Sequence, residues 1–260
     1  MIDLEKIEKT AKLAAIEAGK VCKNYFGQAI AVEVKDELSP LVTIADRQSE
    51  IIMRDIIKAE FPSHIIIGEE FGADKQFGDI SPDDITWALD PIDGTSAFTA
   101  GLPTFVVLIG VWLGGEPLLG LIYQPITGDM WLASGSTPTK RNDIACTAQK
   151  RPLVIATTSP EYLTASSQVW WDKLVGGSVT AVYGGDGHLY GSLASGQISL
   201  VFEQGLKWHD VSALIPVVEN AGCIICDHEG ERLKPYQDSY KVIASKDKQV
   251  LDWALGLKEA

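Results

Sequence analysis

The sequence contains no long hydrophobic run. A helix that crosses a membrane needs about 18 consecutive apolar residues, and the longest candidate, residues 102–113, is shorter and contains Pro103 and Gly110. The first residues also lack the basic and then apolar pattern of a secretory signal. We therefore expect a cytoplasmic protein that does not associate with a membrane.

Basic residues are scarce. The 260 residues include 22 Lys and Arg against 35 Asp and Glu, which gives a formal net charge of −13. Because binding to a nucleic acid backbone depends on clustered Lys and Arg, this balance argues against nucleic acid as a partner. The acidic excess has two interpretations, carboxylates gathered to hold cations or a solvated acidic surface, and composition alone favours the second.

Cysteine is rare as well. Of the four cysteines, Cys223 and Cys226 form a C-x-x-C pair, a pattern that can hold zinc or carry out redox chemistry. The residues around them predict a buried strand, on which side chains three positions apart point to opposite faces. The two thiols therefore cannot share a ligand, and we expect them to be reduced and packed in the core.

The sequence has no internal repeat and no low-complexity tract. Predicted helices and strands alternate along it, which indicates an α/β (α+β) fold of sheets covered by helices. The polar stretch 136–143 is the best boundary. It separates an N-terminal α+β half, residues 1–142, from a C-terminal α/β half, residues 143–260. Helices are predicted at 3–26, 44–60, 160–174, 188–194, 208–221 and from 247 onward. Strands are predicted at 29–34, 65–68, 87–90, 106–112, 118–124, 130–133, 153–156, 180–183, 198–202, 223–226 and 242–244.

An acidic turn follows the predicted strand 87–90. Asp90 and Asp93 lie on either side of Pro91, and Gly94 permits a tight turn. Such a turn can bring both carboxylates and the intervening carbonyl of residue 92 toward one point, an all-oxygen set that suits magnesium.

The residues after this turn add a possible anion site. Residues 95–98 can begin a helical turn, and its free amides would face a phosphate at the same point. The alternative is an Asp-Pro turn in which Asp93 only caps a short helix. These residues by themselves favour the two interpretations about equally.

Three motifs together resemble those of the inositol monophosphatase superfamily. They are the stretch 87–98, the upstream Gly68-Glu69-Glu70 and the late segment Trp208-His209-Asp210-Val211-Ser212-Ala213. The resemblance covers essentially the whole chain. It implies the layered α-β-α-β-α sandwich of the inositol monophosphatase/fructose-1,6-bisphosphatase type, a magnesium-dependent phosphomonoesterase, a homodimer and sensitivity to lithium. One departure is that the family usually places Trp directly before the late Asp, whereas His209 stands between them here.

The resemblance also implies a site with two or three Mg²⁺ ions. Glu69, Asp90 and the carbonyl of Ile92 would hold one ion. Asp90, Asp93 and Asp210 would hold a second, with Asp90 bridging. Two cations a few ångströms apart can clamp a phosphate ester and activate water.

Glu69, Thr95 and Asp46 are the catalytic residues that the resemblance implies. Thr95, within reach of Glu69, would orient the attacking water and help to deprotonate it, so that no phospho-enzyme forms. Asp46 also fits a capping box with Thr43, and that role is compatible with a metal role through water. Because magnesium prefers oxygen ligands, we expect His209 to be a packed or surface residue rather than a ligand.

Seven residues are the expected substrate contacts by the same resemblance. They are Asp93, Gly94, Thr95, Gly185, Asp186, Glu203 and Asp210. The carboxylates of Asp186 and Glu203 suit a substrate with an amine or imidazolium, and less distinctively a polyol. For Asp186, a turn or helix cap before His188 is the alternative.

Residues 157–160 and 183–186 resemble the histidinol-phosphatase branch of the superfamily, although Gly187-His188 stands where that branch often has Cys-Tyr. L-histidinol phosphate is therefore the leading predicted substrate. The alternatives are an inositol-1-monophosphatase, a 3′(2′),5′-bisphosphate nucleotidase and a regulatory binding protein without turnover. Only Lys35, Lys140 and Arg141 support the nucleotidase, and the complete set of carboxylates argues against a protein without turnover.

Overall fold

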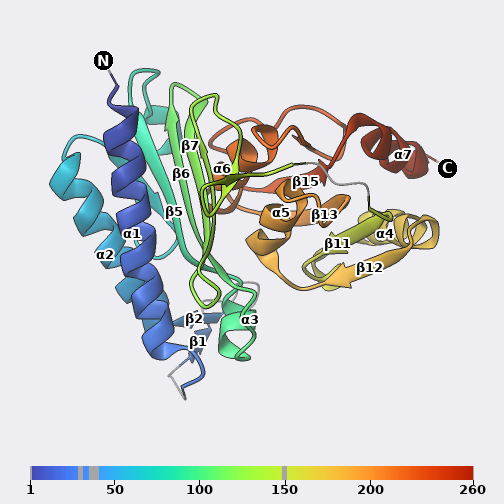
Figure 1. Ribbon diagram of the computed structural model, residues 1–260, viewed down its shortest axis with the longest axis horizontal. Coiled ribbons are helices and arrows are strands. Elements are labelled where there is room, and N and C mark those ends of the chain that lie inside the picture. Colours follow the sequence, from blue (N-terminus) through green and yellow to red (C-terminus); the bar gives the residue numbers. More distant parts are fainter. Residues whose placement is uncertain (1, 29–31, 35–40, 148–150, 260) are drawn as a thin grey trace.

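The computed structural model describes residues 2–28, 32–34, 41–147 and 151–259. Its helices and sheets alternate in five layers (Figure 1). Helices α1 (Leu4–Tyr25) and α2 (Ile44–Glu60) cover one face of an eight-stranded sheet. Between this sheet and a five-stranded sheet lie α5 (Asp186–Ala194) and α6 (Trp208–Glu219). On the far side of the second sheet lie α4 (Ala165–Gly177) and α7 (Lys248–Glu259). The layered α-β-α-β-α sandwich expected from the sequence is confirmed.

The eight-stranded sheet has the order β10-β9-β8-β7-β6-β5-β3-β4. Strands β3 and β5 are parallel, and every other neighbouring pair in this sheet is antiparallel. The strands are β3 (Ile65–Gly68), β4 (Gly72–Ala73), β5 (Ile85–Asp93), β6 (Val106–Leu113), β7 (Glu116–Gln124), β8 (Asp129–Ser134), β9 (Lys140–Arg141) and β10 (Ile144–Ala145).

The five-stranded sheet has the order β12-β11-β13-β15-β14. Its strands are β11 (Val154–Thr157), β12 (Thr180–Tyr183), β13 (Leu200–Leu206), β14 (Ile224–Cys226) and β15 (Tyr240–Ser245). The parallel pairs β11–β12 and β11–β13 lie at one side and the antiparallel pairs at the other. A separate hairpin of β1 (Val32–Val34) and β2 (Leu41–Thr43) lies near the short helix α3 (Thr95–Thr99) in Figure 1. Short 3₁₀ turns occur at Phe77–Asp79 and Pro160–Tyr162.

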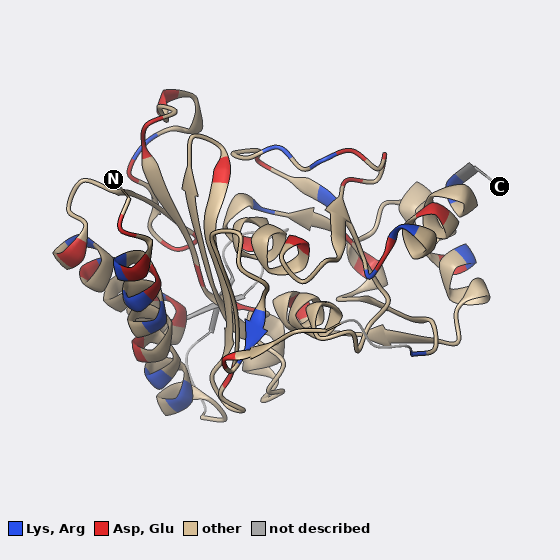
Figure 2. Cartoon of the chain, turned by 45° about the horizontal axis from the view of Figure 1, so that its top comes forward, with Lys and Arg blue, Asp and Glu red and all other residues tan. Residues whose placement is uncertain are grey.

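Helix α1 shows why the outer layer forms. The side chain of Asp3 caps its first turn by accepting a hydrogen bond from the Lys6 amide at 2.9 Å. Its inner face buries mainly small residues, and a Cβ on Gly19 would meet the ring of Tyr123 in β7, so the helix packs tightly on the sheet. Charged residues of both signs follow its length (Figure 2), as expected for an amphipathic surface helix.

The central helix α6 also lies very close to the first sheet. A Cβ on Gly110 in β6 would overlap Ser212, and one on Gly120 in β7 would overlap the carbonyl of Ala213. The indole of Trp112 donates a hydrogen bond to the Ser212 carbonyl at 3.0 Å. These contacts hold the first turn of α6 against the sheet, and the functional residues of that turn are positioned with it.

The predicted elements agree with the structure except in detail. The strand predicted at 87–90 runs on to Asp93 through a register shift. The stretch 72–84, where no helix or strand was predicted, contains the two-residue strand β4, and the polar boundary region contains β9. Residues 160–164 were expected to begin a helix, but Pro160–Tyr162 form a 3₁₀ turn and α4 begins only at Ala165. Of the strand predicted at 29–34, residues 29–31 lie outside the described part of the chain.

Two further predictions concern the cysteines and the absence of a membrane-crossing helix. All four cysteines are free. The Sγ atom of Cys226 lies 3.7 Å from the Ile243 carbonyl, in the hydrophobic core between the five-stranded sheet and helices α4 and α7. The core position expected for Cys226 is therefore confirmed. Cys223 lies just before β14 rather than within it. Within the described ranges, no helix combines the length and the apolar character that a bilayer crossing requires.

Candidate active site

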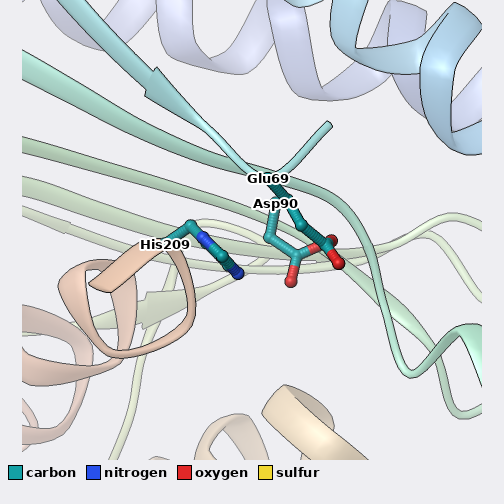
Figure 3. A group of neighbouring side chains, drawn as sticks. All are labelled: Glu69, Asp90 and His209. Atoms are coloured by element: carbon teal, nitrogen blue, oxygen red, sulfur yellow. The ribbon is translucent and has the colours of Figure 1, made fainter. Parts of the chain in front are cut away.

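Parallel strands β3 and β5 bring the first two acidic residues together. Gly68 at the end of β3 is in register with Leu89 in β5, and the Glu69 amide donates a hydrogen bond to the Leu89 carbonyl at 3.2 Å. Glu69, directly after β3, and Asp90, on the neighbouring strand β5, therefore lie side by side toward the carboxyl end of β3. Figure 3 shows their two carboxylates next to one another.

The irregular end of β5 supplies the third carboxylate. Asp90 Oδ1 accepts a hydrogen bond from the Ile92 amide at 3.0 Å, and the pairing with β6 shifts register between Asp90 and Asp93. Gly94 follows with φ of 92°, a left-handed conformation that glycine adopts without strain. The shift turns Asp93 toward the same point as Asp90 although the two residues are three positions apart.

Asp210 comes from the first turn of α6. The Lys207 amide donates to Asp210 Oδ2 at 2.6 Å, so this carboxylate also caps the helix, where the helix dipole favours a negative charge. Carboxylate oxygens of Asp90, Asp93 and Asp210 lie within 4.8 Å of one another. The structure thus brings together the four acidic residues that the sequence suggests as metal ligands.

His209, which was expected to be packed or on the surface rather than a ligand, lies beside the cluster. One ring nitrogen lies within 4.8 Å of carboxylate oxygens of both Glu69 and Asp90. Its Nε2 atom is 3.4 Å from Asp210 Oδ1, and Figure 3 shows the ring pointing toward Asp90. The reason is its place in the first turn of α6, next to Asp210, which local sequence cannot reveal.

The electrostatics of the cluster are unfavourable in the absence of a cation. Burial, together with the charges of Glu69, Asp93 and Asp210, raises the pKa of Asp90 well above its ordinary value. Burial and the charges of Asp186 and Asp210 do the same to the pKa of Asp93, and burial raises the pKa of Asp210. Crowded oxygens that resist ionisation on their own are the donor set expected for a hard divalent cation.

Thr95 and Asp46 lie together beside this cluster, both almost fully buried. The Thr95 hydroxyl donates to the Ile92 carbonyl at 3.1 Å and lies 3.4 Å from Asp46 Oδ1. This contact supports a joint role for the two residues, whereas the predicted pairing of Thr95 with Glu69 stays a prediction. The side chain of Thr43, the other half of the suggested capping box, lies outside the described residues.

A small open pocket lies beside the cluster. Its lining includes the carboxylates of Asp93, Asp210, Asp186 and Glu203, together with Thr158, Tyr162 and Tyr190. Gly94, Thr95 and Gly185, three of the predicted substrate contacts, are absent from this lining among the described residues. The pocket therefore contains two carboxylates of the candidate metal cluster, Asp93 and Asp210, and two further carboxylates, Asp186 and Glu203.

Asp186 begins helix α5 in a left-handed conformation, with φ of 44°. Its amide donates to Thr158 Oγ1 at 3.2 Å, and the next amide, that of Gly187, donates to Asp93 Oδ2. Burial and the nearby charge of Asp210 raise the pKa of Asp186 to about 6. Asp186 thus starts the helix, as the structural alternative suggested, and also faces the pocket.

Glu203 also lines the pocket and is 4% exposed. Its carboxylate accepts hydrogen bonds from the Thr158 amide at 2.8 Å and from the Tyr190 hydroxyl at 3.2 Å. Burial raises its pKa to about 7. The two hydrogen bonds hold the side chain in one orientation toward the pocket.

Glu50 is a supporting residue that the sequence analysis missed. It is fully buried in α2 and accepts hydrogen bonds from the amides of Glu70 at 2.7 Å and Phe71 at 3.3 Å, the two residues that follow Glu69. Arg54, one turn later, donates to it at 2.7 Å. The only signal in the sequence is the Glu and Arg spacing of four on a helix, which is common on solvent-exposed faces.

Comparisons with known proteins agree with this geometry. The model of the inositol monophosphatase family matches residues 3–257. A chloroplastic bifunctional phosphatase of Arabidopsis thaliana is 35% identical over 97% of this chain and 75% of its own length. A histidinol-phosphatase of Chlorobaculum parvum is 31% identical over 84% of each chain.

The similar proteins also include a solved structure and a Nus factor. The structure of an inositol monophosphatase from Zymomonas mobilis matches all of both chains with a TM-score of 0.86 and 34% identity. A Nus factor SuhB of Haemophilus influenzae is 29% identical over 91% of this chain and 90% of its own. The resemblance expected from the sequence is confirmed: this chain belongs to the inositol monophosphatase family of metal-dependent phosphatases.

Proposed function

We propose that this phosphatase hydrolyses L-histidinol phosphate with magnesium as its cofactor. The main support for this substrate is the pair of carboxylates, Asp186 and Glu203, that line the pocket beside the acidic cluster. The substrate carries an amine, and an ammonium beside two buried carboxylates gains charge-assisted hydrogen bonds. The similarity to the Chlorobaculum parvum histidinol-phosphatase supports the same substrate.

Five groups would hold the cations. Glu69, Asp90 and the Ile92 carbonyl would form one position, and Asp90, Asp93 and Asp210 the other. Such all-oxygen donor sets suit magnesium. When bound, magnesium supplies charge neutralisation at the phosphate and a more acidic water.

The reaction transfers the phosphoryl group to water. The water oxygen forms a new bond to phosphorus, the ester bond to the leaving oxygen breaks, and that oxygen takes up a proton to become the alcohol. Thr95 would orient the water through its hydroxyl, and Asp46, 3.4 Å from that hydroxyl, would accept the proton that the water loses. The amides of Gly94 and Thr95 would contact the phosphate.

Inositol 1-phosphate is the second candidate. It is favoured by the likeness to the Zymomonas mobilis inositol monophosphatase, and Asp186 and Glu203 can accept hydrogen bonds from ring hydroxyls. A bisphosphate nucleotide is supported less, because no Lys or Arg of the described chain lines the pocket, and Arg141 pairs with Asp129 at 2.8 Å. Lys35 lies outside the described residues.

The substrate is tested with Asp186→Asn. Asparagine accepts a φ of 44° as readily as aspartate, so the backbone should be unchanged. We expect kcat/KM for L-histidinol phosphate to fall about 10- to 100-fold more than kcat/KM for inositol 1-phosphate, because the lost charge faces the substrate amine only in the first case. Steady-state phosphate release on both substrates measures this difference.

A matched control is Asp172→Asn, which removes an exposed carboxylate on α4 away from the pocket lining and should change neither substrate. Equal losses on the two substrates in Asp186→Asn would exclude recognition of the amine by Asp186. If the wild-type protein prefers inositol 1-phosphate or phosphoadenosine phosphate in the same assay, L-histidinol phosphate is not its substrate.

A further inference from the structure

His209 offers a nitrogen atom at one of the two cation positions. A ring nitrogen and oxygens of Glu69 and Asp90 lie within 4.8 Å of one another. Two atoms bonded to one ion at about 2.1 Å are separated by at most about 4.2 Å. A small side-chain rotation would therefore bring all three atoms within reach of a single ion; Figure 3 shows the three side chains as they lie.

The fold holds this histidine at the cluster. The preceding residue, Trp208, is buried, and its ring packs against Trp112 and Tyr236 with centroid distances of 4.9 Å in both cases. The following residue, Asp210, caps α6 through the Lys207 amide. With both neighbours fixed, the backbone of His209 has little freedom to carry the ring away from the carboxylates.

The two cation positions differ in their donors. The position of Asp90, Asp93 and Asp210 offers carboxylate oxygens only, as magnesium prefers. The position of Glu69 and Asp90 has an imidazole beside its oxygens, and imidazole suits first-row transition-metal ions such as zinc, iron and nickel better than it suits magnesium.

We propose that His209 coordinates the cation held by Glu69 and Asp90 and gives that position a preference for a first-row transition-metal ion. The other position, which offers carboxylate oxygens only, keeps its preference for magnesium. The inference rests on the proposed function and refines one of its two cation positions. The competing role for His209 is a charge partner of Asp210, whose carboxylate lies 3.4 Å away.

Pulsed electron paramagnetic resonance separates the two roles without an activity assay. Mn²⁺ is added at one equivalent to the metal-free full-length protein, and modulation of the electron spin echo by ¹⁴N is recorded. A directly bound imidazole nitrogen is expected to give strong ¹⁴N modulation, which changes on ¹⁵N-histidine labelling and disappears in His209→Asn. His188→Asn, which alters a histidine against Trp131 outside both ligand groups, should keep the modulation.

Calorimetric titration gives the second readout. In His209→Asn we expect the affinity for Mn²⁺ and Zn²⁺ to fall about 10- to 100-fold and the affinity for Mg²⁺ to change less than about threefold. Equal losses for all three ions would assign His209 to charge balance and overturn the inference.

The proposed function and this inference fail differently. Manganese binding and phosphate release without ¹⁴N modulation would overturn the role of His209 and leave the phosphatase intact. A protein that binds none of the three ions and releases no phosphate would overturn both.

Discussion

Asp90→Asn is expected to lower kcat/KM for phosphate release by about a thousandfold or more, the largest effect of any single substitution in the chain. Asp90 belongs to both groups of potential metal ligands and is the only residue shared by them. Its loss therefore weakens both cation positions at once. Steady-state phosphate release at saturating magnesium measures the effect.

The substitution is also informative about folding. Asparagine retains an oxygen that can accept the hydrogen bond from the Ile92 amide, so β5 should keep its irregular end. Because the carboxylate of Asp90 is crowded by like charges, the metal-free variant should melt at a higher temperature than the metal-free wild type. A suitable control is Asp252→Asn, at an exposed residue of α7. A folded Asp90→Asn protein that keeps more than a tenth of the wild-type kcat/KM would refute the bridging role.

The second large effect is a fall in the stability of the metal-free protein as pH rises. The folded-state pKa values of Asp186, about 6, and Glu203, about 7, exceed the ordinary values of 3.8 and 4.5, and the pKa values of Asp90 and Asp93 are raised as well. The folded state thus binds more protons than the unfolded state across this window. The stability that these carboxylates contribute is full below about pH 4, is lost between about pH 4 and 7, and the loss is complete above the raised pKa values.

Thermal melting in a chelator measures this loss. One pKa unit corresponds to about 1.4 kcal/mol, and a domain of this size loses about 2–4 °C per kcal/mol, so Tm should fall on the order of 10 °C between pH 5 and pH 8. With saturating magnesium, the cluster is neutralised and the fall should shrink markedly, because cation binding favours the folded state. Parallel curves with and without magnesium would show that the carboxylates do not bind it.

Local patterns in the sequence were enough for most of the fold. Helix α2 has the predicted bounds because its apolar spacing is regular and Pro62 follows its end. Strand β5 was predicted too short, because Pro91 interrupts the apolar run and the pairing continues only through a register shift. The two-residue strands β4, β9 and β10 are too short to leave any periodic signal.

Some residues of the site could be predicted from the sequence and others could not. Glu69, Asp90, Asp93 and Asp210 could be suggested because each stands in a motif, and the structure brings them to one place. Glu50 and His209 could not be assigned in this way. Their roles depend on how α2 and α6 pack against the sheet, and helix packing brings together residues far apart in sequence. The preference of magnesium for oxygen predicted a packed or surface histidine, and only the packing of α6 shows that its ring lies beside Glu69 and Asp90.

The central claim is that the carboxylate cluster hydrolyses a phosphate monoester only with divalent cations bound. The most direct test is phosphate release from L-histidinol phosphate and inositol 1-phosphate by protein stripped with a chelator and then given back magnesium. The account predicts no measurable release from the stripped protein, recovery on return of magnesium, and no recovery in Asp90→Asn. Equal release with and without the cation, or none from any phosphate monoester under either condition, would contradict it.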